Sequence, residues 1–415
     1  MTTPSLNINA DRLNRTLAEL GRIGETPGGM MRLAYSPYDL QGREYAMGLM
    51  RQAGLEIRVD PAGNVIARKS RAAPDLPAIA LGSHTDTVPN GGKYDGALGV
   101  LGAVEVAQTL AESGHTLRHP LEIIIFTNEE GTRFHRWLLG SRAMAGLLEP
   151  EDYDAVDEEG VSIEQRLADV GGDLNRIDQA RRYPGELAAY FELHIEQGPT
   201  LHRAGTPLGA VTGITGRYVF KVEVQGTANH AGTTPMPDRH DALAAASHLV
   251  LATQRLATDA EICRVATVGN IQVTPNAVNV VPGEVTMGVE FRDIDTNALS
   301  AAETTLRRNA AEIADVNRVS VNITQVEAAR AVPMPARMQG LVAEAADQAG
   351  LAWESLPSGA GHDAQAMAAI TESGMVFVPS VEGISHSPHE FTPPADCANG
   401  AQALLNMLLM ADARL

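Results

Sequence analysis

Four short polar segments carry the residues whose types could do chemistry. These segments are GSHTDTVPNGGKYDG, TNEEG, HIEQGP and GISHSPHE, and each begins or ends at an expected strand end or a glycine-rich turn. They offer imidazoles and carboxylates without a thiolate, a ligand set that suits zinc, manganese or cobalt in a site with open positions. The residues concerned are His84, Asp95, Glu129, Glu130, His194 and His386.

A site with two metal ions needs one carboxylate that can bridge the ions, further nitrogen or oxygen ligands for each ion, and a separate carboxylate that takes a proton from water. The sequence offers this number of groups. Adjacent side chains point in different directions, so one of Glu129 and Glu130 can bind metal while the other faces the substrate. Any of these residues alone is more often an ordinary core or surface residue, and the prediction therefore rests on their combination.

The elements that must position these segments follow from the apolar pattern. Between about Leu76 and Arg142, apolar runs alternate with a helical stretch rich in small residues, which predicts an α/β sheet with the motifs at its strand ends. Just before this stretch, IRVDPAGNVIARK predicts a hairpin that turns at Gly63 and Asn64.

A different rhythm occupies the stretch from Tyr218 to about Val326. The order β, α, β, β, α, β predicts a four-stranded antiparallel sheet covered by two helices on one side, and the alternation in YVFKVEVQG predicts that this sheet is half exposed. Because the α/β pattern resumes afterwards, we interpret residues 214–329 as a domain inserted into a catalytic domain of residues 1–213 and 330–415. Two domains also suit a chain of 415 residues.

Composition narrows the classes of partner and compartment. Acidic residues number 51 and basic residues 32, for a formal charge of -19, and no Lys/Arg cluster could follow a phosphate backbone, so we expect no nucleic-acid partner. The N-terminal segment lacks a basic stretch followed by an apolar one, and no apolar run is long enough to cross a bilayer. Cys263 and Cys397 are the two cysteines, which fits a reducing compartment. We therefore expect a cytoplasmic protein without a membrane role, in which an anionic substrate needs a locally placed Arg.

The four segments, together with GTANHAGTTPMPDRHDA, PNAVNVVPGEV and FRD, closely resemble the dinuclear-metal aminoacylase and carboxypeptidase superfamily. Within it they resemble the hydantoinase/carbamoylase amidases, a branch that contains N-carbamoyl-L-amino acid hydrolases, β-ureidopropionases and allantoate amidohydrolases. The resemblance runs over almost the whole chain in the expected order. HIEQGP is specific, because the peptidase branches usually have an acidic ligand where His194 stands.

This resemblance implies a fold and a metal site. The fold is a mixed-sheet metallo-hydrolase domain of the α/β class with an inserted α+β domain that serves in dimerisation or as a lid, so a homodimer is expected. Each subunit would hold two divalent metal ions, Zn²⁺ or alternatively Mn²⁺, Co²⁺ or Ni²⁺. His84 and His194 would bind one ion, Glu130 and His386 the other, and Asp95 would bridge them.

The resemblance also implies catalytic and orienting roles outside the ligand set. Asp86 would orient the imidazole of His84, and Glu129 would be the general base that activates water and then protonates the leaving nitrogen. His230 is similar to a histidine that reaches into the neighbouring subunit's site and stabilises the oxyanion. Arg292 is the Arg that can hold a substrate carboxylate with its planar fork.

Further residues are expected to contact the substrate. Gln197 and Asn279 are similar to residues that hydrogen-bond it, and Gly361 to one that contacts it through the backbone. Arg217 could touch the ligand or be a surface charge beside a hinge. The pair that follows Gly361, His362 and Asp363, could support the site or cap a helix.

The predicted function is hydrolysis of the carbamoyl C–N bond of an N-carbamoyl-L-amino acid or a related ureido acid. Allantoate amidohydrolase would share every metal ligand and stays an alternative, and 3-ureidopropionate is a further possible substrate. His194 argues against a dipeptidase or aminoacylase, and the complete ligand set with Glu129 argues against a binding protein that has lost catalysis. The stretch TRFHRWLLGS departs from the family pattern, so the side-chain preference stays open.

Overall fold

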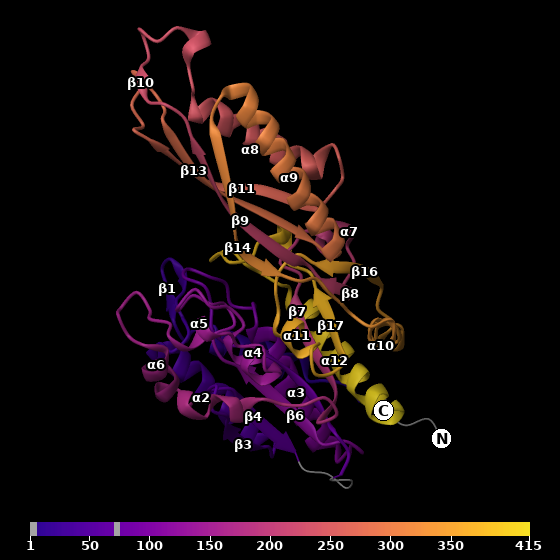
Figure 1. The fold of residues 1–415 in the computed structure, drawn as a ribbon. Coiled ribbons are helices and arrows are strands. Elements are labelled where there is room, and N and C mark those ends of the chain that lie inside the picture. The colour runs from indigo at the N-terminus through magenta and orange to yellow at the C-terminus, as the bar shows by residue number, and fades with distance from the viewer. Residues whose placement is uncertain (1–5, 70–74) are drawn as a thin grey trace. The chain divides into compact units, whose positions relative to one another are not determined.

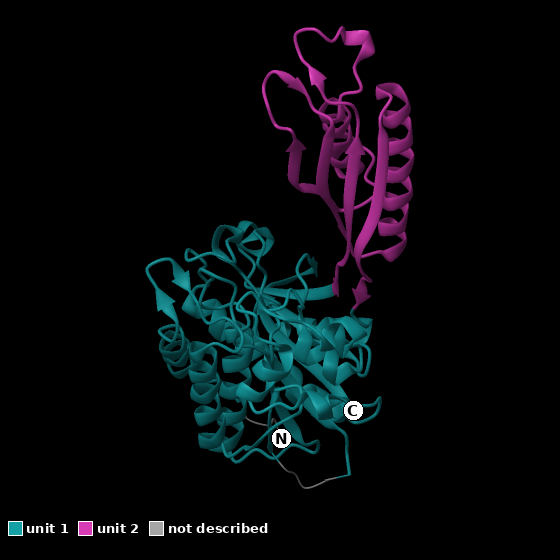
Figure 2. Cartoon of the chain, turned by 60° about the vertical axis from the view of Figure 1, so that its left-hand side comes forward, with its two compact units in different colours: residues 1–212, 334–415 teal, residues 213–333 magenta. Residues whose placement is uncertain are grey.

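The computed structural model describes residues 6–69 and 75–415, so the first five residues of the N-terminal segment lie outside the described residues. The chain divides into two compact units (Figure 2). Unit 1 comprises residues 1–212 and 334–415, and unit 2 comprises residues 213–333, one residue earlier and four residues later than the limits of the insertion expected from the sequence. Among the described residues, no helix is long and apolar enough to cross a membrane.

A mixed sheet forms the centre of unit 1 (Figure 1). Its strand order is β15-β8-β17-β7-β5-β6-β4-β3, with β16 paired to β8, and β7, β5, β6 and β17 run parallel to one another. β5, β6 and β17 are buried along their whole length, as strands covered on both faces are. The strands are β3 (Glu56–Val59), β4 (Val65–Lys69), β5 (Ala78–His84), β6 (Leu121–Phe126), β7 (Leu187–Ile195), β8 (Leu208–Ile214), β16 (Trp353–Ser358) and β17 (Ser373–Val378), together with β15 (Val332–Pro333), whose two residues fall within unit 2 and pair with the end of β8.

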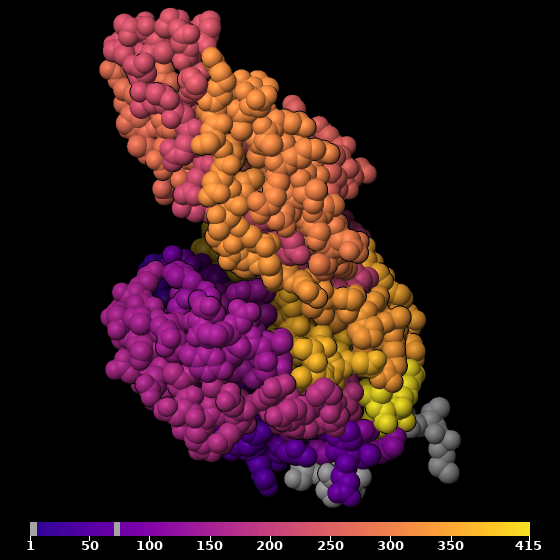
Figure 3. Space-filling model, viewed as in Figure 1, coloured from indigo at the N-terminus to yellow at the C-terminus, as the bar shows by residue number. Residues whose placement is uncertain are grey.

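Helices supply the apolar cover of this sheet. α3 packs against β5 and β7, and its sequence is apolar on nearly every side because α1 and α12 pack against it as well. α4 is mostly buried, whereas the segment from α5 to η1 has many exposed residues and lies on the surface of unit 1, where its atoms are magenta (Figure 3). The longer helices are α1 (Ala10–Leu20), α2 (Pro37–Gln52), α3 (Ala97–Ser113), α10 (Ala336–Ala349) and α12 (Pro394–Arg414). The shorter elements are β1 (Glu25–Thr26), β2 (Gly29–Met30), α4 (Leu139–Ala145), α5 (Pro150–Tyr153), α6 (Ile163–Asp169), η1 (Leu174–Ala180), α7 (Thr200–Ala204), α11 (Asp363–Met367) and η3 (Val381–Gly383).

The predicted hairpin is formed by β3 and β4, which pair antiparallel. Gly63 has a φ of 80° and lies in the turn, where its N–H donates to the carbonyl of Asp60. The side chain of Asp60 accepts hydrogen bonds from the backbone N–H groups of Ala62 and Asn64. The turn is therefore held by a buried carboxylate as well as by its glycine.

Unit 2 has the predicted β, α, β, β, α, β order. Its antiparallel sheet has the strand order β11-β13-β9-β14, and α8 and α9 pack together against it. Phe220, Val222 and Val224 of β9 are buried in the core that these helices share, whereas Lys221 on the opposite face is exposed, as the alternation predicts. The elements are β9 (Gly216–Gln225), β10 (Asn229–His230), η2 (Met236–Asp238), α8 (Ala242–Thr258), β11 (Val265–Thr274), β12 (Val280–Val281), β13 (Glu284–Asp293), α9 (Thr296–Asn317) and β14 (Ser320–Ala329).

Candidate metal centre

The predicted ligands come from the carboxyl ends of four neighbouring parallel strands. His84 ends β5, and His194 is the last residue but one of β7. Glu130 follows β6, and His386 follows β17. Because β17, β7, β5 and β6 are adjacent and parallel, these ends meet at one edge of the sheet, which is where α/β folds place their sites.

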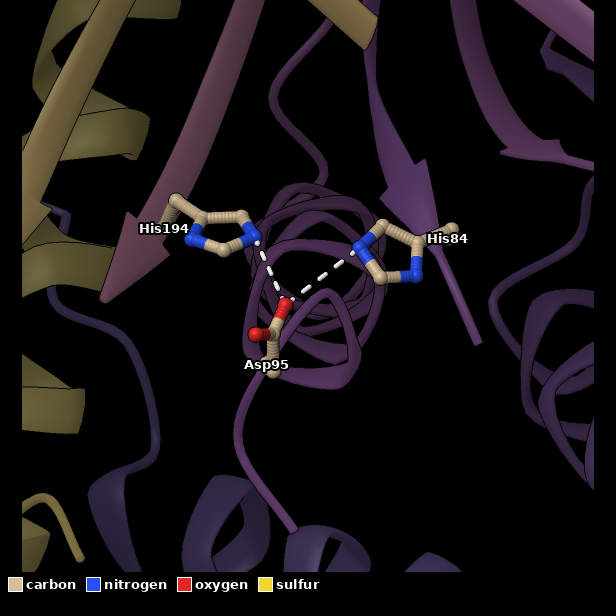
Figure 4. A group of neighbouring side chains, drawn as sticks. All are labelled: His84, Asp95 and His194. Carbon is tan, nitrogen blue, oxygen red and sulfur yellow. Dashed lines mark ion pairs between the residues drawn. The ribbon is translucent and has the colours of Figure 1, made fainter. Parts of the chain in front are cut away.

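A first group consists of His84, Asp95 and His194, all buried (Figure 4). Oδ1 of Asp95 lies 3.4 Å from Nε2 of His84 and 3.2 Å from Nε2 of His194. Asp95 belongs to the loop between β5 and α3, and the two imidazoles approach its carboxylate from two strands. The three ligand atoms lie within 4.8 Å of one another, close enough to hold one metal ion.

Backbone carbonyls fix the orientation of both imidazoles in this group. Nδ1 of His84 lies 3.0 Å from the carbonyl oxygen of Asp86, and Nδ1 of His194 lies 3.0 Å from that of Ile195. A carbonyl can only accept a hydrogen bond, so in the neutral ring Nδ1 carries the proton and Nε2 presents its lone pair. Two lone pairs thus converge with a carboxylate oxygen, an arrangement that suits a cation.

A second group consists of Asp95, Glu130 and His386. Nε2 of His386 lies 3.2 Å from Oδ2 of Asp95 and 3.5 Å from Oε2 of Glu130. Asp95 therefore turns one carboxylate oxygen to each group. This is the geometry that a bridging carboxylate needs in a site with two metal ions.

Glu129 stands beside the first group without belonging to either one. Its Oε2 lies 3.5 Å from Nε2 of His84, and the residue is buried. The carboxylate of Asp86 accepts long hydrogen bonds from the backbone N–H groups of Glu129 and Glu130, at 3.4 and 3.3 Å. Glu129 therefore lies beside His84 of the first group, while Glu130 lies beside His386 of the second. The carboxylate of Asp86 holds the backbone that carries both glutamates.

The position of Asp86 differs in detail from the expectation. Its carboxylate lies 3.7 Å from Nδ1 of His84, farther than its own backbone carbonyl at 3.0 Å. The imidazole is oriented by the carbonyl group, and the carboxylate acts on the loop of the two glutamates. The physical reason is that the carbonyl of Asp86 is part of the backbone only two residues after His84, so no side chain has to be ordered to bring this acceptor to the imidazole.

Buried charge in this cluster favours cations. Burial raises the pKa of Glu129 well above its usual value and raises the pKa of Glu130 to about 8. Hydrogen bonding to Asp95 raises the pKa of His386 to about 9. The cluster therefore binds extra protons that divalent cations would replace. Although burial opposes ionisation of Asp95, its close contacts with the three histidines outweigh this effect and hold the pKa of this carboxyl well below its usual range.

Gln197 joins the site through a loop after β7. Its Nε2 donates to Oδ2 of Asp95 at 2.7 Å and lies 3.3 Å from Nε2 of His386. Its Oε1 is buried and has no hydrogen-bond partner among the described residues. A buried carbonyl oxygen without a partner is costly, so it suits a ligand that brings a donor N–H.

Unit 2 holds four of the predicted substrate-contacting and catalytic residues. His230 and Asn279 are exposed neighbours, because β10 pairs with β12 and the N–H of Ala231 donates to the carbonyl of Asn279. Arg217 and Arg292 are cross-strand partners on β9 and β13. The arginine pair lies at one end of β9, whereas the chain reaches His230 only after the other end of that strand.

Arg217 and Arg292 both form ion pairs with glutamates of unit 2. Nε of Arg217 lies 2.6 Å from Glu290 and Nη1 lies 2.8 Å from Glu327, while Nε of Arg292 lies 2.7 Å from Glu290. Two like charges directly opposite one another destabilise a sheet, and the two glutamates offset this repulsion. Arg217 thus forms ion pairs with both Glu290 and Glu327.

Comparisons with known proteins agree with this geometry. Residues 80–410 match the peptidase family M20/M25/M40. The chain belongs to this family. It is 40% identical over 398 residues to an N-carbamoyl-L-amino acid amidohydrolase of Geobacillus stearothermophilus, covering 96% of this chain and 97% of the relative. It is 37% identical to a ureidoglycolate hydrolase of Arabidopsis thaliana, covering 96% of this chain and 86% of the relative. A crystal structure of a hydantoinase/carbamoylase family amidase from Burkholderia multivorans matches it with a TM-score of 0.90 at 37% identity, over 99% of this chain and 100% of the other.

Two buried residues extend the ligand cluster of this M20-family chain: Glu192, which was not expected from the sequence, and His362, for which support of the site was one of the expected roles. Glu192 and His362 form a third potential metal-binding group with His194, whose ring centroid lies 4.4 Å from that of His362. Glu192 accepts hydrogen bonds from the hydroxyls of Ser83 and Tyr190 and from a backbone N–H. Its acidic side chain within the apolar run LAAYFELHI was the signal that could have singled it out.

The segment around Gly361 brings a further residue to the site. A Cβ added at Gly361 would collide with the indole of Trp137, including Cε3 at 3.0 Å, so the edge of the ring around Cζ3 lies directly against this backbone. Trp137 belongs to the unusual stretch TRFHRWLLGS. His362 is the N-cap residue of α11, yet its side chain makes no capping hydrogen bond and Nε2 lies 2.8 Å from Oγ of Ser358. His362 was expected either to support the site or to cap the helix, and capping by its side chain is not observed.

Proposed function

We propose that this chain hydrolyses the carbamoyl C–N bond of an N-carbamoyl-L-amino acid or a closely related ureido acid, with two divalent metal ions in each subunit. The observation that carries the proposal is the division of the Asp95 carboxylate between two ligand groups, with the buried carboxyl of Glu129 beside them. The likeness to amidases named for N-carbamoyl-L-amino acids supports this substrate class.

The ligands divide naturally between the two ions. His84 and His194 would hold one ion and Glu130 and His386 the other, with Asp95 shared. Nitrogen and carboxylate ligands suit Zn²⁺, and Mn²⁺, Co²⁺ or Ni²⁺ are the alternatives. Bound ions would supply Lewis-acid activation of the carbamoyl oxygen and of water.

Proton transfer is assigned to Glu129. Its carboxylate is buried next to His84 and is not part of either ligand group, so it is available to accept a proton from the attacking water. The same group then passes that proton to the leaving nitrogen. A carboxyl whose pKa is raised by burial is a stronger base than an exposed one, which suits this task.

Substrate binding is assigned to groups that offer hydrogen bonds or charge. Gln197 has a buried oxygen that lacks a partner and suits a ureido N–H donor. We propose that Arg292 holds the substrate carboxylate and that Asn279 and the backbone of Gly361 add hydrogen bonds. Arg217 and Arg292 both form ion pairs with Glu290. We propose that Arg217 acts on the substrate carboxylate indirectly, because its positive charge lies beside Arg292 and offsets part of the negative charge of Glu290.

His230 is proposed to donate a hydrogen bond to the oxyanion in the site of a second copy of the chain. Arg217, the cross-strand partner of Arg292, and Gln225 are eight residues apart on β9, or about 26 Å at ~3.3 Å per residue. His230 follows Gln225, so His230 and Arg292 of one chain lie at opposite ends of the unit 2 sheet. This separation supports a homodimer in which each site uses residues of two inserted domains.

The edges of the unit 2 sheet offer a place for that contact. β11 is an edge strand whose residues are mostly exposed, among them Val265 and Ile271. Edge strands present unpaired backbone groups that readily pair with another chain. Light scattering after size-exclusion chromatography measures the oligomeric state, and a monomer at all concentrations contradicts the dimer. We also propose a cytoplasmic location, in keeping with two free cysteines.

A panel of substrates tests the proposed function. The protein is loaded with Zn²⁺, Mn²⁺, Co²⁺ or Ni²⁺ and incubated with N-carbamoyl-L-amino acids, 3-ureidopropionate, allantoate and ureidoglycolate, and ammonia release is measured. Fastest release from N-carbamoyl-L-amino acids is expected. Ureidoglycolate is a second candidate because a relative named for it is 37% identical. Turnover of dipeptides or N-acetyl amino acids without turnover of ureido compounds would contradict the proposal.

A further inference from the structure

A buried carboxylate outside both ligand groups binds the loop that carries Asp95. Oε1 of Glu390 accepts hydrogen bonds from the backbone N–H groups of Tyr94 and Asp95, at 2.9 and 3.1 Å. Glu390 is only 6% exposed, and it belongs to the loop between β17 and α12. These bonds join two loops that are 295 residues apart in the sequence.

The second oxygen of Glu390 holds its own loop in turn. Oε2 accepts a hydrogen bond from Oγ of Ser385 at 2.8 Å, and the same hydroxyl lies 3.3 Å from Oδ2 of Asp95. Ser385 immediately precedes His386. One oxygen of the Glu390 carboxylate thus accepts a hydrogen bond from the backbone of Asp95, and the other accepts one from Ser385, the residue beside His386.

The surrounding residues pack closely around this carboxylate. A Cβ added at Gly92 would collide with the carboxyl group of Glu390, so the carboxyl lies directly against that backbone. On the flanks, the rings of Tyr94 and Phe391 pack edge to face with centroids 6.0 Å apart. These packing contacts add to the hydrogen bonds of Glu390 that join the two loops.

We propose that Glu390 is a positioning residue that presets the distance between Asp95 and His386 for metal binding. The proposal rests on the proposed function to the extent that Asp95 and His386 are taken as metal ligands. The charge-assisted hydrogen bonds of Glu390 are about twice as strong as neutral ones. They act on the backbone of Asp95 and on Ser385, the residue that precedes His386. Substitution of a side chain that holds a metal ligand in place commonly lowers metal affinity by about 10- to 100-fold.

Zn²⁺ binding to three variants tests this role, with affinity measured by competition against a chromophoric chelator. Glu390→Ala removes three hydrogen bonds, and we expect a 10- to 100-fold loss of Zn²⁺ affinity. Glu390→Gln keeps an acceptor for the two N–H groups and can donate to Ser385, so affinity within about tenfold of wild type is expected. His389→Ala is the matched control, because this exposed residue lies next to Glu390 in the same loop.

The outcomes separate positioning from a role in stability alone. Reduced Zn²⁺ affinity in Glu390→Ala with recovery in Glu390→Gln supports the proposal. A lower melting temperature of the metal-free protein with wild-type Zn²⁺ affinity overturns it. If Glu390→Ala does not fold, Ser385→Ala removes the link to Oε2 and the 3.3 Å contact with Oδ2 of Asp95 but leaves both backbone hydrogen bonds of Glu390, and its Zn²⁺ affinity must fall about 3- to 10-fold for the proposal to stand. The proposed function fails separately, as absence of ureido turnover in the wild-type protein.

Discussion

Gly96→Ala should damage the metal centre through one added methyl group. Gly96 is the N-cap residue of α3 and has a φ of 61°, a conformation that alanine adopts only with strain. A Cβ at this position would lie 2.5 Å from both Cδ2 and Cε1 of His84. The backbone N–H of Gly96 also donates to Nε2 of His194 at 3.2 Å. The substitution therefore strains a backbone that touches both histidines of the first group.

The magnitude follows from two separate terms. With a φ of 61° and a ψ of -45°, Gly96 lies outside the left-handed helical region, and holding alanine in such a sparsely populated conformation costs about 1–3 kcal/mol. Carbon atoms normally approach to about 3.5 Å, so a methyl at 2.5 Å from the ring forces overpacking that costs about 1–3 kcal/mol. The His84 ring is 1% exposed and its Nδ1 is hydrogen-bonded, so it cannot move aside freely. The total, about 2–6 kcal/mol, corresponds to a factor of roughly 30 or more in an equilibrium constant.

Two measurements show where this energy goes. If the ring stays in place, the free energy of unfolding of the metal-free protein falls, as measured with urea. If the ring rotates away, the clash is relieved but Zn²⁺ affinity falls instead. Gly48→Ala is the control, because this glycine lies inside α2 with nothing within 4 Å, and alanine should stabilise it by about 0.5–1 kcal/mol. Wild-type stability together with wild-type Zn²⁺ affinity in Gly96→Ala would refute the reasoning.

Three further predictions concern the base, the thiols and pH. Glu129→Gln should keep its bound metal by elemental analysis but lower kcat by about 10²–10⁴, and unchanged turnover removes Glu129 from the base role. Burial raises the pKa of Cys263 to about 11 and that of Cys397 to about 12, so neither should react with Ellman's reagent at pH 8 until the protein is unfolded; rapid reaction of the native protein contradicts this. Burial raises the pKa of Asp60 to about 6, so its proton stabilises the folded state fully below about pH 4, and this contribution, up to ~3 kcal/mol, is lost as pH rises through 6. Urea unfolding should show that Asp60→Asn lacks this pH dependence, and parallel stability curves for both proteins would contradict the assignment.

Much of the fold was open to prediction because each element carries its own periodic signal. The apolar runs of β5 and β6 predicted buried parallel strands, and the alternation along β9 predicted a half-exposed antiparallel sheet. Both predictions are confirmed. The edge order of the large sheet was not predictable in the same way, because pairing of β8 with β17 and β15 depends on contacts between distant segments.

The choice of ligand types also came from the sequence. His84, Glu130 and His386 follow or end strands that the apolar pattern identifies, and parallel strands bring such ends to one edge. Glu390 shows the limit of this reasoning. Nothing in SPHE distinguishes a surface glutamate from one that binds the loop of Asp95, because that contact spans 295 residues.

The sequence by itself determined which side chains could bind metal and at which strand ends they stand, since side-chain chemistry and local periodicity are written residue by residue. The tertiary structure decided how they are shared. It turned the two oxygens of Asp95 to different groups, set the carbonyl of Asp86 against His84, and paired Arg217 with Glu290 and Glu327. These outcomes depend on loop paths and rotamers fixed by packing between segments far apart in the chain, which no local pattern encodes.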